Sequence, residues 1–457
     1  MSDPLLLLNL EKVTGNELKA LQKRCMLLMQ QDDDPQKFPG AQPVSFERKH
    51  LKPANNPGSG YISLLSSPYF AAEKTDGVRY MLLILGNTGA FTVDRKFDIR
   101  RLPPMRFPSR QDPSTPLDNT LLDGELIIER GGSGQPLTNL LNCGKPSDEG
   151  STSAAAGDDG RQERIRFLAY DACRVAGRAV CDEPLRLRLM ALRRDVLTPR
   201  FRLAKADPSA FAGDIFTLEM KDMFVLPQLP HLFSKVSQAE PDANILYAFE
   251  DPLRKLSHGN DGIIFTPAID PYRPYTCPSL LKWKPANMNS VDFRLQTKWR
   301  REGDLPEPQP RFVLCVAKQT SIEPFCWITF DDANFERFSK DPKADTRIIE
   351  CVYDPAWHTV EYNPDDSMER TWDNPRTIPG GWRFERIRED KHLPNDFSTV
   401  LSIQTSVRDG VTAPELLYSL GIRTAPGSLG AFEVIEHGHG SASGAPAPPG
   451  QPQPQLS

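Results

Sequence analysis

Short apolar runs bounded by turn residues dominate the first two thirds of the chain. The clearest are YMLLIL (80–85), FTVD (91–94), LLDGELII (121–128), RIRFLAYDAC (164–173), GIIFTP (262–267) and LLKWKP (280–285). Runs of this length flanked by Gly, Pro, Asn or Asp are typical of strands. We therefore predict a sheet-rich domain over residues 46–287.

Apolar residues recur at helical spacing in other segments. Residues 1–45 are predicted to form a helical segment followed by a loop, and residues 396–423 a second helical segment. Residues 184–200 are predicted to form an amphipathic helix whose arginines make a solvated face, with RNA contact as the alternative. The apolar side of this helix consists of Leu185, Leu189, Leu192 and Val196.

A second strand-rich region covers residues 288–395. It contains RFVLCVA (311–317), CWITF (326–330) and RIIECVYD (347–354). Several short strands within about a hundred residues indicate a small barrel or sandwich, and an oligonucleotide-binding (OB) barrel fits that size. The predicted fold class is therefore α+β with antiparallel sheets and a C-terminal OB-fold barrel. Residues 145–162 are expected to be a flexible insertion and residues 424–457 a disordered tail.

Composition narrows the environment of the protein. The 457 residues carry a formal net charge of −5, so any nucleic-acid or nucleotide site must be a local basic cluster. The eight cysteines include no CxxC pair, which favours buried thiols in a reducing compartment over a zinc site or disulfide framework. No signal peptide or membrane segment is evident, so we expect a soluble intracellular protein with no membrane partner.

The stretch Glu73-Lys-Thr-Asp-Gly-Val-Arg-Tyr80 contains the first candidate for chemistry. A lysine followed by Asp-Gly places an amine at a strand edge, where a tight turn lets a ligand approach. A nucleophilic lysine needs neighbouring cations, a metal or desolvation, because its reference pKa is about 10.4. Taken alone, KTDG favours a solvent-facing turn with a surface lysine over a catalytic amine.

Several charged motifs further along the chain favour a catalytic role for Lys74. LLDGELII contains Asp123 and Glu125, Asp261-Gly262 opens GIIFTP, and Lys282-Trp-Lys284 lies in a predicted strand. The segment Trp382–Lys391 then gathers four cations and an aspartate. Phosphoryl transfer requires a nucleophile, carboxylates that bind a divalent metal, and cations that bind the leaving pyrophosphate.

In their order, these motifs resemble those of a known family. KTDGVR, LLDGEL, RFLAYD, DGIIFTP, LLKWKP and WRFERIREDK are similar to the six collinear motifs of the covalent nucleotidyltransferases, which comprise mRNA capping guanylyltransferases and ATP-dependent ligases. KWKP, the RxRxDK ending and the phrases FPGAQPVSF (38–46), VDRKF (93–97) and VDF (291–293) favour the capping branch. The resemblance covers residues 38–395.

The resemblance implies a role for each matching residue. Lys74 would attack the α-phosphate of GTP and form a covalent GMP–lysine intermediate. Lys282 and Lys284 would contact the α-phosphate and keep the pKa of Lys74 low. Asp261 would bind Mg²⁺ or Mn²⁺, with Glu125 as the second candidate ligand. The other nucleotide contacts would be Arg79, Arg95, Asp123, Gly124, Glu125, Phe167, Ile264, Trp283, Arg386, Arg388, Asp390 and Lys391.

The same resemblance implies the substrates and partners. GMP would pass to the 5′-diphosphate end of RNA in the nucleus, after a separate RNA 5′-triphosphatase has trimmed that end. RNA polymerase II, through its phosphorylated C-terminal repeats, would be a further partner. Two alternatives stay open, an ATP-dependent polynucleotide ligase and a non-catalytic RNA-binding scaffold of the same fold. The last motif lies in a different predicted domain from Lys74, so we expect domain closure during the reaction.

Overall fold

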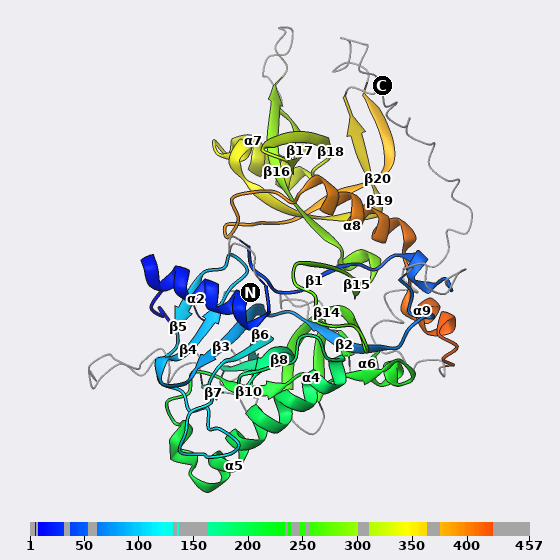
Figure 1. Ribbon diagram of the computed structural model, residues 1–457. Helices are drawn as coiled ribbons and strands as arrows, with labels where there is room; N and C mark the ends of the chain where they lie inside the picture. The colour runs from blue at the N-terminus through cyan, green and yellow to red at the C-terminus, as the bar shows by residue number, and fades with distance from the viewer. Residues whose placement is uncertain are drawn as a thin grey trace.

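The structure is a computed structural model, and it describes most of the chain. The described residues are 5, 8–31, 37–53, 62–130, 135–136, 163–233, 236–238, 247–251, 256–299, 310–362 and 375–423. The predicted insertion at 145–162 and the predicted tail at 424–457 lie outside them. Figure 1 shows a lower part that carries two sheets and an upper part that carries the third.

The largest sheet has eight strands and forms the centre of the lower part. Its order is β10-β8-β6-β3-β4-β5, and β7 and β9 pair with β8. All its pairings are antiparallel except that of β10 with β8. The strands are β3 (Val78–Leu85), β4 (Gly89–Val93), β5 (Ile99–Arg101), β6 (Thr120–Arg130), β7 (Gln135–Pro136), β8 (Glu163–Val175), β9 (Arg178–Ala179) and β10 (Thr217–Met220).

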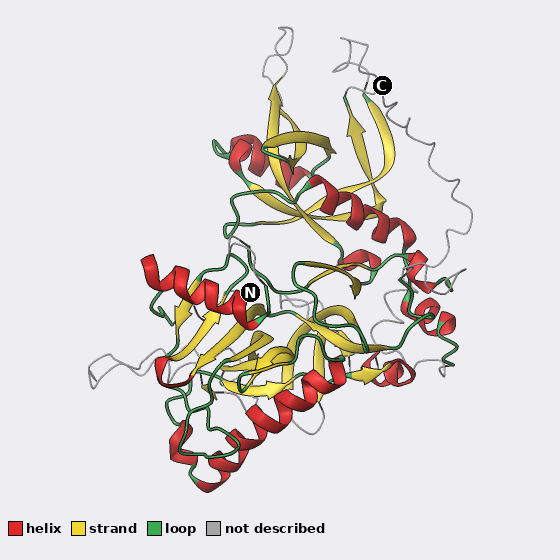
Figure 2. Cartoon of the chain, in the orientation of Figure 1, coloured by secondary structure: helices red, strands yellow, loops and turns green. Residues whose placement is uncertain are grey.

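Helices bury both faces of this sheet, because its central strands are apolar on both sides. On one face pack α4 (Leu185–Leu192) and the π-helical turn Arg193–Leu197, which continues into α5 (Thr198–Ala206). The four apolar residues predicted for this helix are all buried. On the other face lies α2 (Gly15–Leu28), whose buried side chains join the same core as strands β3 and β4. Figure 2 shows these helices as an outer layer on the strands.

The second sheet has seven strands and carries most of the predicted chemistry. Its path is β1-β15-β14-β13-β12, and β2 pairs with both β14 and β11. The small helix α6 (Leu229–Phe233) packs against the apolar face of this sheet. The strands are β1 (Gln42–Ser45), β2 (Tyr69–Thr75), β11 (Phe224–Val225), β12 (Val236–Gln238), β13 (Tyr247–Asp251), β14 (Leu256–Pro267) and β15 (Thr276–Trp283).

The upper part contains a five-stranded antiparallel sheet in the order β18-β17-β16-β19-β20. Helix α7 (Asp332–Lys340) connects β18 to β19. This order, with one helix between the third and fourth strands, is that of a partly open Greek-key OB barrel, so the predicted fold class is confirmed. The strands are β16 (Ser290–Trp299), β17 (Pro310–Lys318), β18 (Ser321–Ile328), β19 (Ile348–Glu361) and β20 (Arg376–Ile387).

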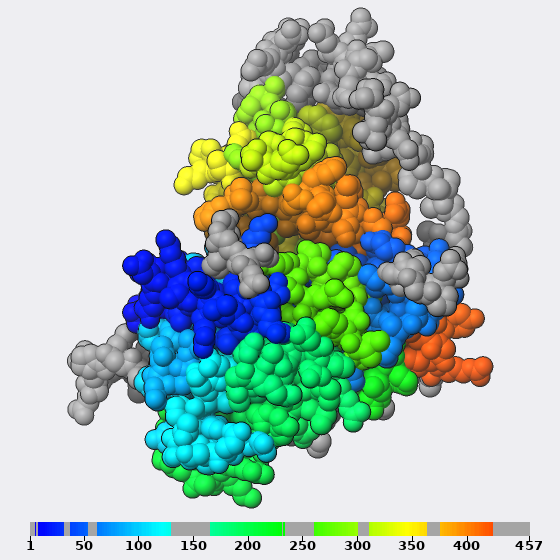
Figure 3. Space-filling view, viewed as in Figure 1, coloured from blue at the N-terminus to red at the C-terminus, as the bar shows by residue number. Residues whose placement is uncertain are grey.

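The C-terminal helices connect the two parts. Helix α8 (Phe397–Asp409) buries Val400 and Ile403 in the core of the OB barrel. Helix α9 (Ala413–Ser419) returns to the second sheet and buries Leu416 and Leu417 there. Figure 3 shows α8 as an orange band along the boundary of the two parts. The C-terminal segment therefore anchors both parts to each other.

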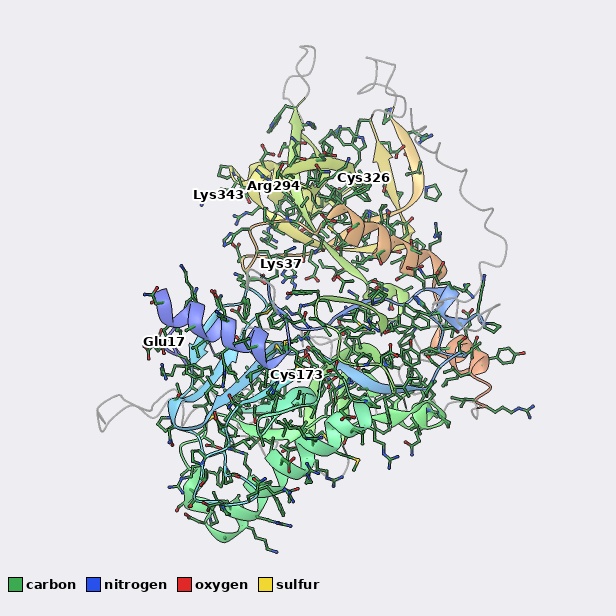
Figure 4. All side chains as sticks on the ribbon, viewed as in Figure 1. Glu17, Lys37, Cys173, Arg294, Cys326 and Lys343 are labelled. Atoms are coloured by element: carbon green, nitrogen blue, oxygen red, sulfur yellow. The ribbon has the colours of Figure 1, made fainter. Side chains whose placement is uncertain are left out.

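Two further expectations concern membranes and cysteines. Within the described ranges, no helix has both the length and the apolar character that crossing a membrane requires. The seven cysteines in the described part are free thiols, six of them buried. Figure 4 places Cys173 in the lower part and Cys326 in the OB barrel. The eighth, at position 143, lies outside the described residues.

Candidate active site

A β-bulge in β14 sets the centre of the site. Asn260 pairs with Thr75 of β2, but Ile263 pairs with Glu73, so β14 contains one extra residue at Asp261-Gly262. Bulges re-aim side chains, and this one directs Asp261 toward β2. A β-carbon on Gly262 would lie 2.1 Å from the carbonyl oxygen of Trp283, so only glycine fits there.

Asp261 is shared by two lysines. Its Oδ1 lies 2.6 Å from Nζ of Lys74, and its Oδ2 lies 2.5 Å from Nζ of Lys284. The side chains of Lys74, Asp261 and Lys284 are 26%, 24% and 19% exposed, so this triad is partly screened from solvent yet open to a ligand. Three strands, β2, β14 and β15, therefore bring together the predicted nucleophile, the predicted metal ligand and one predicted phosphate contact.

The protonation state of Lys74 corrects the sequence-based expectation. Burial acts to lower its pKa, but the charge and hydrogen bond of Asp261, with help from Glu125 and Asp76, raise the pKa above its ordinary value. The neighbouring lysines were expected to keep it low. In this structure the pKa of Lys74 is raised instead, because the charge and hydrogen bond of the Asp261 carboxylate outweigh the effect of burial.

Lys282 instead carries the depressed pKa. Burial and the positive charges of Lys284, Lys74 and Arg95 lower the pKa of Lys282 to about 8. Lys282 pairs across the strands with Ile264, which pairs with Ala72, so these residues form one row on the face that Lys74 also occupies. Arg95 belongs to this cationic region because its charge acts on Lys282.

This depressed pKa predicts a pH dependence for GTP capture. Lys282 loses its positive charge as the pH rises through about 8. We therefore expect kcat/KM for GTP, measured as the rate of covalent labelling, to fall on the alkaline side. Lys282→Arg keeps a cation at every accessible pH, and so is expected to shift this fall to higher pH. An identical alkaline fall in both proteins would contradict the assignment to Lys282.

A second polar group lies beneath the first, around Asp123. Arg79 donates from Nε and Nη2 to the two carboxylate oxygens of Asp123, at 3.0 and 2.5 Å, and from Nη1 to the carbonyl of Ala41. The hydroxyls of Tyr170 and Tyr272 donate to the same carboxylate. Arg79 is 6% and Asp123 1% exposed. The carboxylate of Asp123 thus holds the side chain of Arg79 in place, and the predicted role of Arg79 toward the nucleotide stays a prediction.

Glu125 lies beside a buried cation that the sequence analysis missed. Nζ of Lys221 is 3.4 Å from Oε2 of Glu125 and donates to the hydroxyl of Thr75. Lys221 is 5% exposed, so its charge acts in a poorly solvated region between β2 and β6. No motif surrounds it, because a single lysine in EMKDMF has no distinguishing spacing.

Tyr170 is a second missed residue. Gly124 pairs with Ala169 and Asp123 with Asp171, so Tyr170 is the extra residue of a bulge in β8. Its half-buried ring lies 6.0 Å from the charged groups of both Arg79 and Lys221. A bulge cannot be located from alternation alone, so no signal in the sequence marks Tyr170, and the family resemblance pointed to Phe167 of the same motif.

Two predicted nucleotide contacts are corrected. Phe167 is fully buried, packs on Phe216 and fills the space above Gly124, where a β-carbon would lie 2.2 Å from its ring. The ring of Trp283 is also buried, and its Nε1 donates to the carbonyl of Val411 at 2.9 Å. Both are core residues, so neither presents a face to a ligand. Gly124 serves the packing of Phe167.

The final motif occupies the OB barrel, at the end of β20 and in the turn after it. Its three predicted cations form ion pairs with carboxylates of the same barrel, and its predicted aspartate is one of these carboxylates. The structure therefore gathers Lys74, Asp261, Lys282 and Lys284 and places the final motif in the other part of the molecule. The predicted residues of that motif are Arg386, Arg388, Asp390 and Lys391.

The fold and the site define a class of protein. A lysine at the end of a strand pairs with a carboxylate, and a second lysine pairs with the same carboxylate. An appended OB barrel carries the RxDK motif. This is the arrangement of a covalent nucleotidyltransferase.

Comparison with known sequences identifies the family. The family model "mRNA capping enzyme, catalytic domain" matches residues 8–140 and 156–286, and the model "mRNA capping enzyme, C-terminal domain" matches residues 288–417. The chain belongs to the mRNA capping enzyme family.

Individual relatives support this membership. The "mRNA-capping enzyme" of Danio rerio is 29% identical over 406 residues, which cover 88% of this chain and 52% of the relative. The "mRNA-capping enzyme subunit alpha" of Schizosaccharomyces pombe is 28% identical over 420 residues, which cover 89% of this chain and 85% of the relative. The chain thus spans about half of the zebrafish relative and most of the fungal one.

Solved structures give a weaker likeness. A mycobacterial DNA ligase D complexed with ATP and MES has a TM-score of 0.32 and 14% identity, covering 78% of this chain and 96% of the ligase. The ATP-dependent DNA ligase of bacteriophage T7 has a TM-score of 0.30 and 13% identity, covering 74% of this chain and 98% of the ligase. Scores of this size add nothing to the assignment.

Proposed function

We propose that this protein is an mRNA guanylyltransferase that transfers GMP from GTP to the 5′-diphosphate end of RNA through Lys74. The observation that carries the proposal is the 2.6 Å contact of Lys74 with an Asp261 carboxylate that Lys284 also holds. That contact fixes the amine at a strand end, in a chain whose family is that of the mRNA capping enzymes.

The first half-reaction forms the covalent intermediate. The amine of Lys74 attacks the α-phosphorus of GTP, a nitrogen–phosphorus bond forms, and the bond to the bridging β-oxygen breaks, so that pyrophosphate leaves. Lys74 must lose a proton before or during the attack, and Asp261 is the acceptor nearest to it. Lys282 and Lys284 stabilise the charge that develops on the α-phosphate oxygens.

The second half-reaction returns the lysine to its starting state. A terminal oxygen of the RNA 5′-diphosphate attacks the phosphorus of the intermediate, the nitrogen–phosphorus bond breaks, and a 5′–5′ triphosphate bridge forms. Lys74 takes up a proton as it leaves. The same cations serve this step, because it passes through the same kind of pentavalent transition state.

The nucleoside would lie across the face that Ile264 and Tyr170 border. Ile264 stands in one row with Lys282, and Tyr170 adjoins Arg79 and Lys221. We propose Tyr170, rather than Phe167, as the aromatic ring of the nucleoside site, since its ring is the half-buried one. Arg79 and Glu125 remain the proposed ribose contacts.

The site fits a divalent metal that is held partly by substrate. Within the part of the chain that the structure describes, no three His, Cys, Asp or Glu side chains converge as a metal cage. Mg²⁺ typically binds one or two carboxylates together with substrate phosphates, and the oxygen donors of Asp261 suit Mg²⁺ or Mn²⁺. When bound, such an ion would neutralise phosphate charge during the transfer. Glu125 is the proposed second ligand.

The proposal also covers the partners and the location. The product requires an RNA 5′-diphosphate, so a separate RNA 5′-triphosphatase would supply it. The fungal relatives are named as alpha subunits, which supports a second subunit. Because the protein would act on nascent transcripts, it would be located in the nucleus and would bind the phosphorylated C-terminal repeats of RNA polymerase II.

Covalent labelling distinguishes this function from its alternatives. Incubation with GTP radiolabelled at the α-phosphate and Mg²⁺ or Mn²⁺ is expected to give a labelled protein band with an acid-labile, alkali-stable bond. Labelling by ATP but not GTP would favour a ligase, and a protein that binds RNA without labelling would favour the scaffold. A chelator added before GTP should prevent labelling, because the proposed reaction uses a divalent metal.

A further inference from the structure

A row of charged residues crosses three neighbouring strands of the OB barrel. Asp292 of β16 pairs with Glu350 of β19, and Glu350 pairs with Arg386 of β20. Their strand neighbours Phe293, Ile349 and Cys351 belong to the barrel core. Because side chains alternate along a strand, the charged row lies on the opposite, outer face of the sheet.

Glu350 is the centre of this row. Its Oε1 accepts a hydrogen bond from the hydroxyl of Ser290 at 2.5 Å, and its Oε2 accepts one from Nε of Arg386 at 2.6 Å. Nη1 of Arg388 lies 3.6 Å from the same Oε2. Burial opposes ionisation, but these donors and charges lower the pKa of Glu350, so the group is a carboxylate at neutral pH.

Two other carboxylates complete the charge balance. Asp292 accepts from Nη1 of Arg388 at 2.9 Å and from the ammonium of Lys391. Asp390 accepts from Nε and Nη2 of Arg388 at 2.9 and 2.7 Å. The cations Arg386, Arg388 and Lys391 are therefore matched by the carboxylates Asp292, Glu350 and Asp390.

The three carboxylates differ in how readily solvent and ligands reach them. The side chain of Asp390 is 65% exposed, whereas those of Glu350 and Asp292 are 15% and 7% exposed. A phosphate can displace an exposed carboxylate from a guanidinium at little cost, because exposed ion pairs contribute little free energy. Glu350 and Asp292 are fixed in the sheet and act as a scaffold for the arginines.

This row adjoins the segment that leads out of the active site. The turn Ala286–Met288 is separated from Lys284 by one residue and lies against β19, and Ser290, which donates a hydrogen bond to Glu350, begins the next strand, β16. Ser290, which contacts the carboxylate that holds Arg386, therefore lies six positions after Lys284 in the chain.

We infer that Glu350 is a positioning residue for GMP transfer, which holds Arg386 and Arg388 ready for the departing pyrophosphate. The inference rests on the proposed function. Arg386 is half exposed, and fixing its long side chain in advance removes an entropy cost that would otherwise fall on the step in which pyrophosphate is bound. Glu350 itself touches no reacting atom.

The two half-reactions separate this role from a merely structural one. Glu350→Gln keeps the size and one acceptor but removes the charge. We expect formation of the GMP–lysine intermediate from GTP, and its reversal by added pyrophosphate, to slow about tenfold, the scale of one charge-assisted hydrogen bond. Transfer of GMP from the isolated intermediate to 5′-diphosphate RNA is expected to stay within about twofold of wild type, because no pyrophosphate leaves in that step.

Glu361→Gln is the matched control. Glu361 pairs with Arg376 at 2.6 Å on the same two strands, β19 and β20, at their other end. It is expected to leave both half-reactions unchanged, and both variants are to be compared with wild type by thermal unfolding.

Three outcomes would overturn the inference. Equal slowing of both half-reactions by Glu350→Gln would indicate a structural role, and unchanged rates in both would show that Glu350 positions nothing. In either case the wild-type protein still labels with GTP, and the proposed function stands. Failure of the wild-type protein to label would overturn the function and the inference together.

Discussion

Alanine at position 74 is expected to abolish covalent labelling by GTP, to below about a thousandth of the wild-type level. No other group can replace the amine, because the intermediate is a bond to its nitrogen. Labelling is measured on a denaturing gel with GTP radiolabelled at the α-phosphate.

The matched control for this variant is Lys205→Ala. Lys205 is an exposed lysine in the last turn of α5, and its removal should leave labelling unchanged. Loss of Lys74 leaves Asp261 paired with Lys284, so the carboxylate is not stranded and the protein should fold. Substantial labelling of Lys74→Ala would show that another residue is the nucleophile.

Asparagine at position 261 is expected to slow formation of the intermediate by about a hundredfold. The change removes the charge that orients Lys74 and Lys284, the nearest proton acceptor and the proposed metal ligand. It should also change the pH dependence of the residual rate. Asp261 raises the pKa of Lys74, and the free amine is the reactive form, so the rising limb of the rate profile should move to lower pH in the variant.

Asp98→Asn is the control for this second variant. Asp98 forms a 2.8 Å ion pair with Lys12, which is the same chemistry at an exposed position away from β2 and β14. A rising limb at the same pH in wild type and Asp261→Asn would contradict the account of how Asp261 acts on Lys74. A rate within a few fold of wild type would remove Asp261 from the mechanism.

The sequence predicted the elements whose apolar runs are continuous. β3, β6, β8, β14 and the helix from Leu185 onward fall where their patterns indicate. Other elements have weak patterns. β20, with the sequence RTIPGGWRFERI, contains proline, two glycines and several charges, so it was recognised as a motif but not as a strand. Helix α7 is nine residues long and mostly polar, and β1 is four residues long; both are shorter than the segments in which a helical period is read reliably from sequence.

The sequence predicted which charged residues of the candidate site lie together, but not the local geometry of the strands that carry them. Lys74, Asp261 and Lys284 come together as their motifs indicated. The bulges at Asp261 and Tyr170 could not be predicted, because one extra residue reverses which face a side chain occupies.

Contacts between single residues that are distant in the chain could not be predicted from the sequence either. Lys221 and Glu350 belong to no recognised motif, and the partners of each lie on strands that are distant in the chain. The raised pKa of Lys74 depends on a distance of 2.6 Å to a residue 187 positions away. A family motif gives the residue types but not this balance of charges.

The most direct test of the whole scheme is to locate the modified side chain. Protein incubated with GTP and a divalent metal is digested, and the peptide carrying the GMP adduct is sequenced by mass spectrometry. The account predicts a single phosphoramidate on the nitrogen of Lys74. An adduct on another residue, or a protein that consumes GTP without acquiring any adduct, would contradict it.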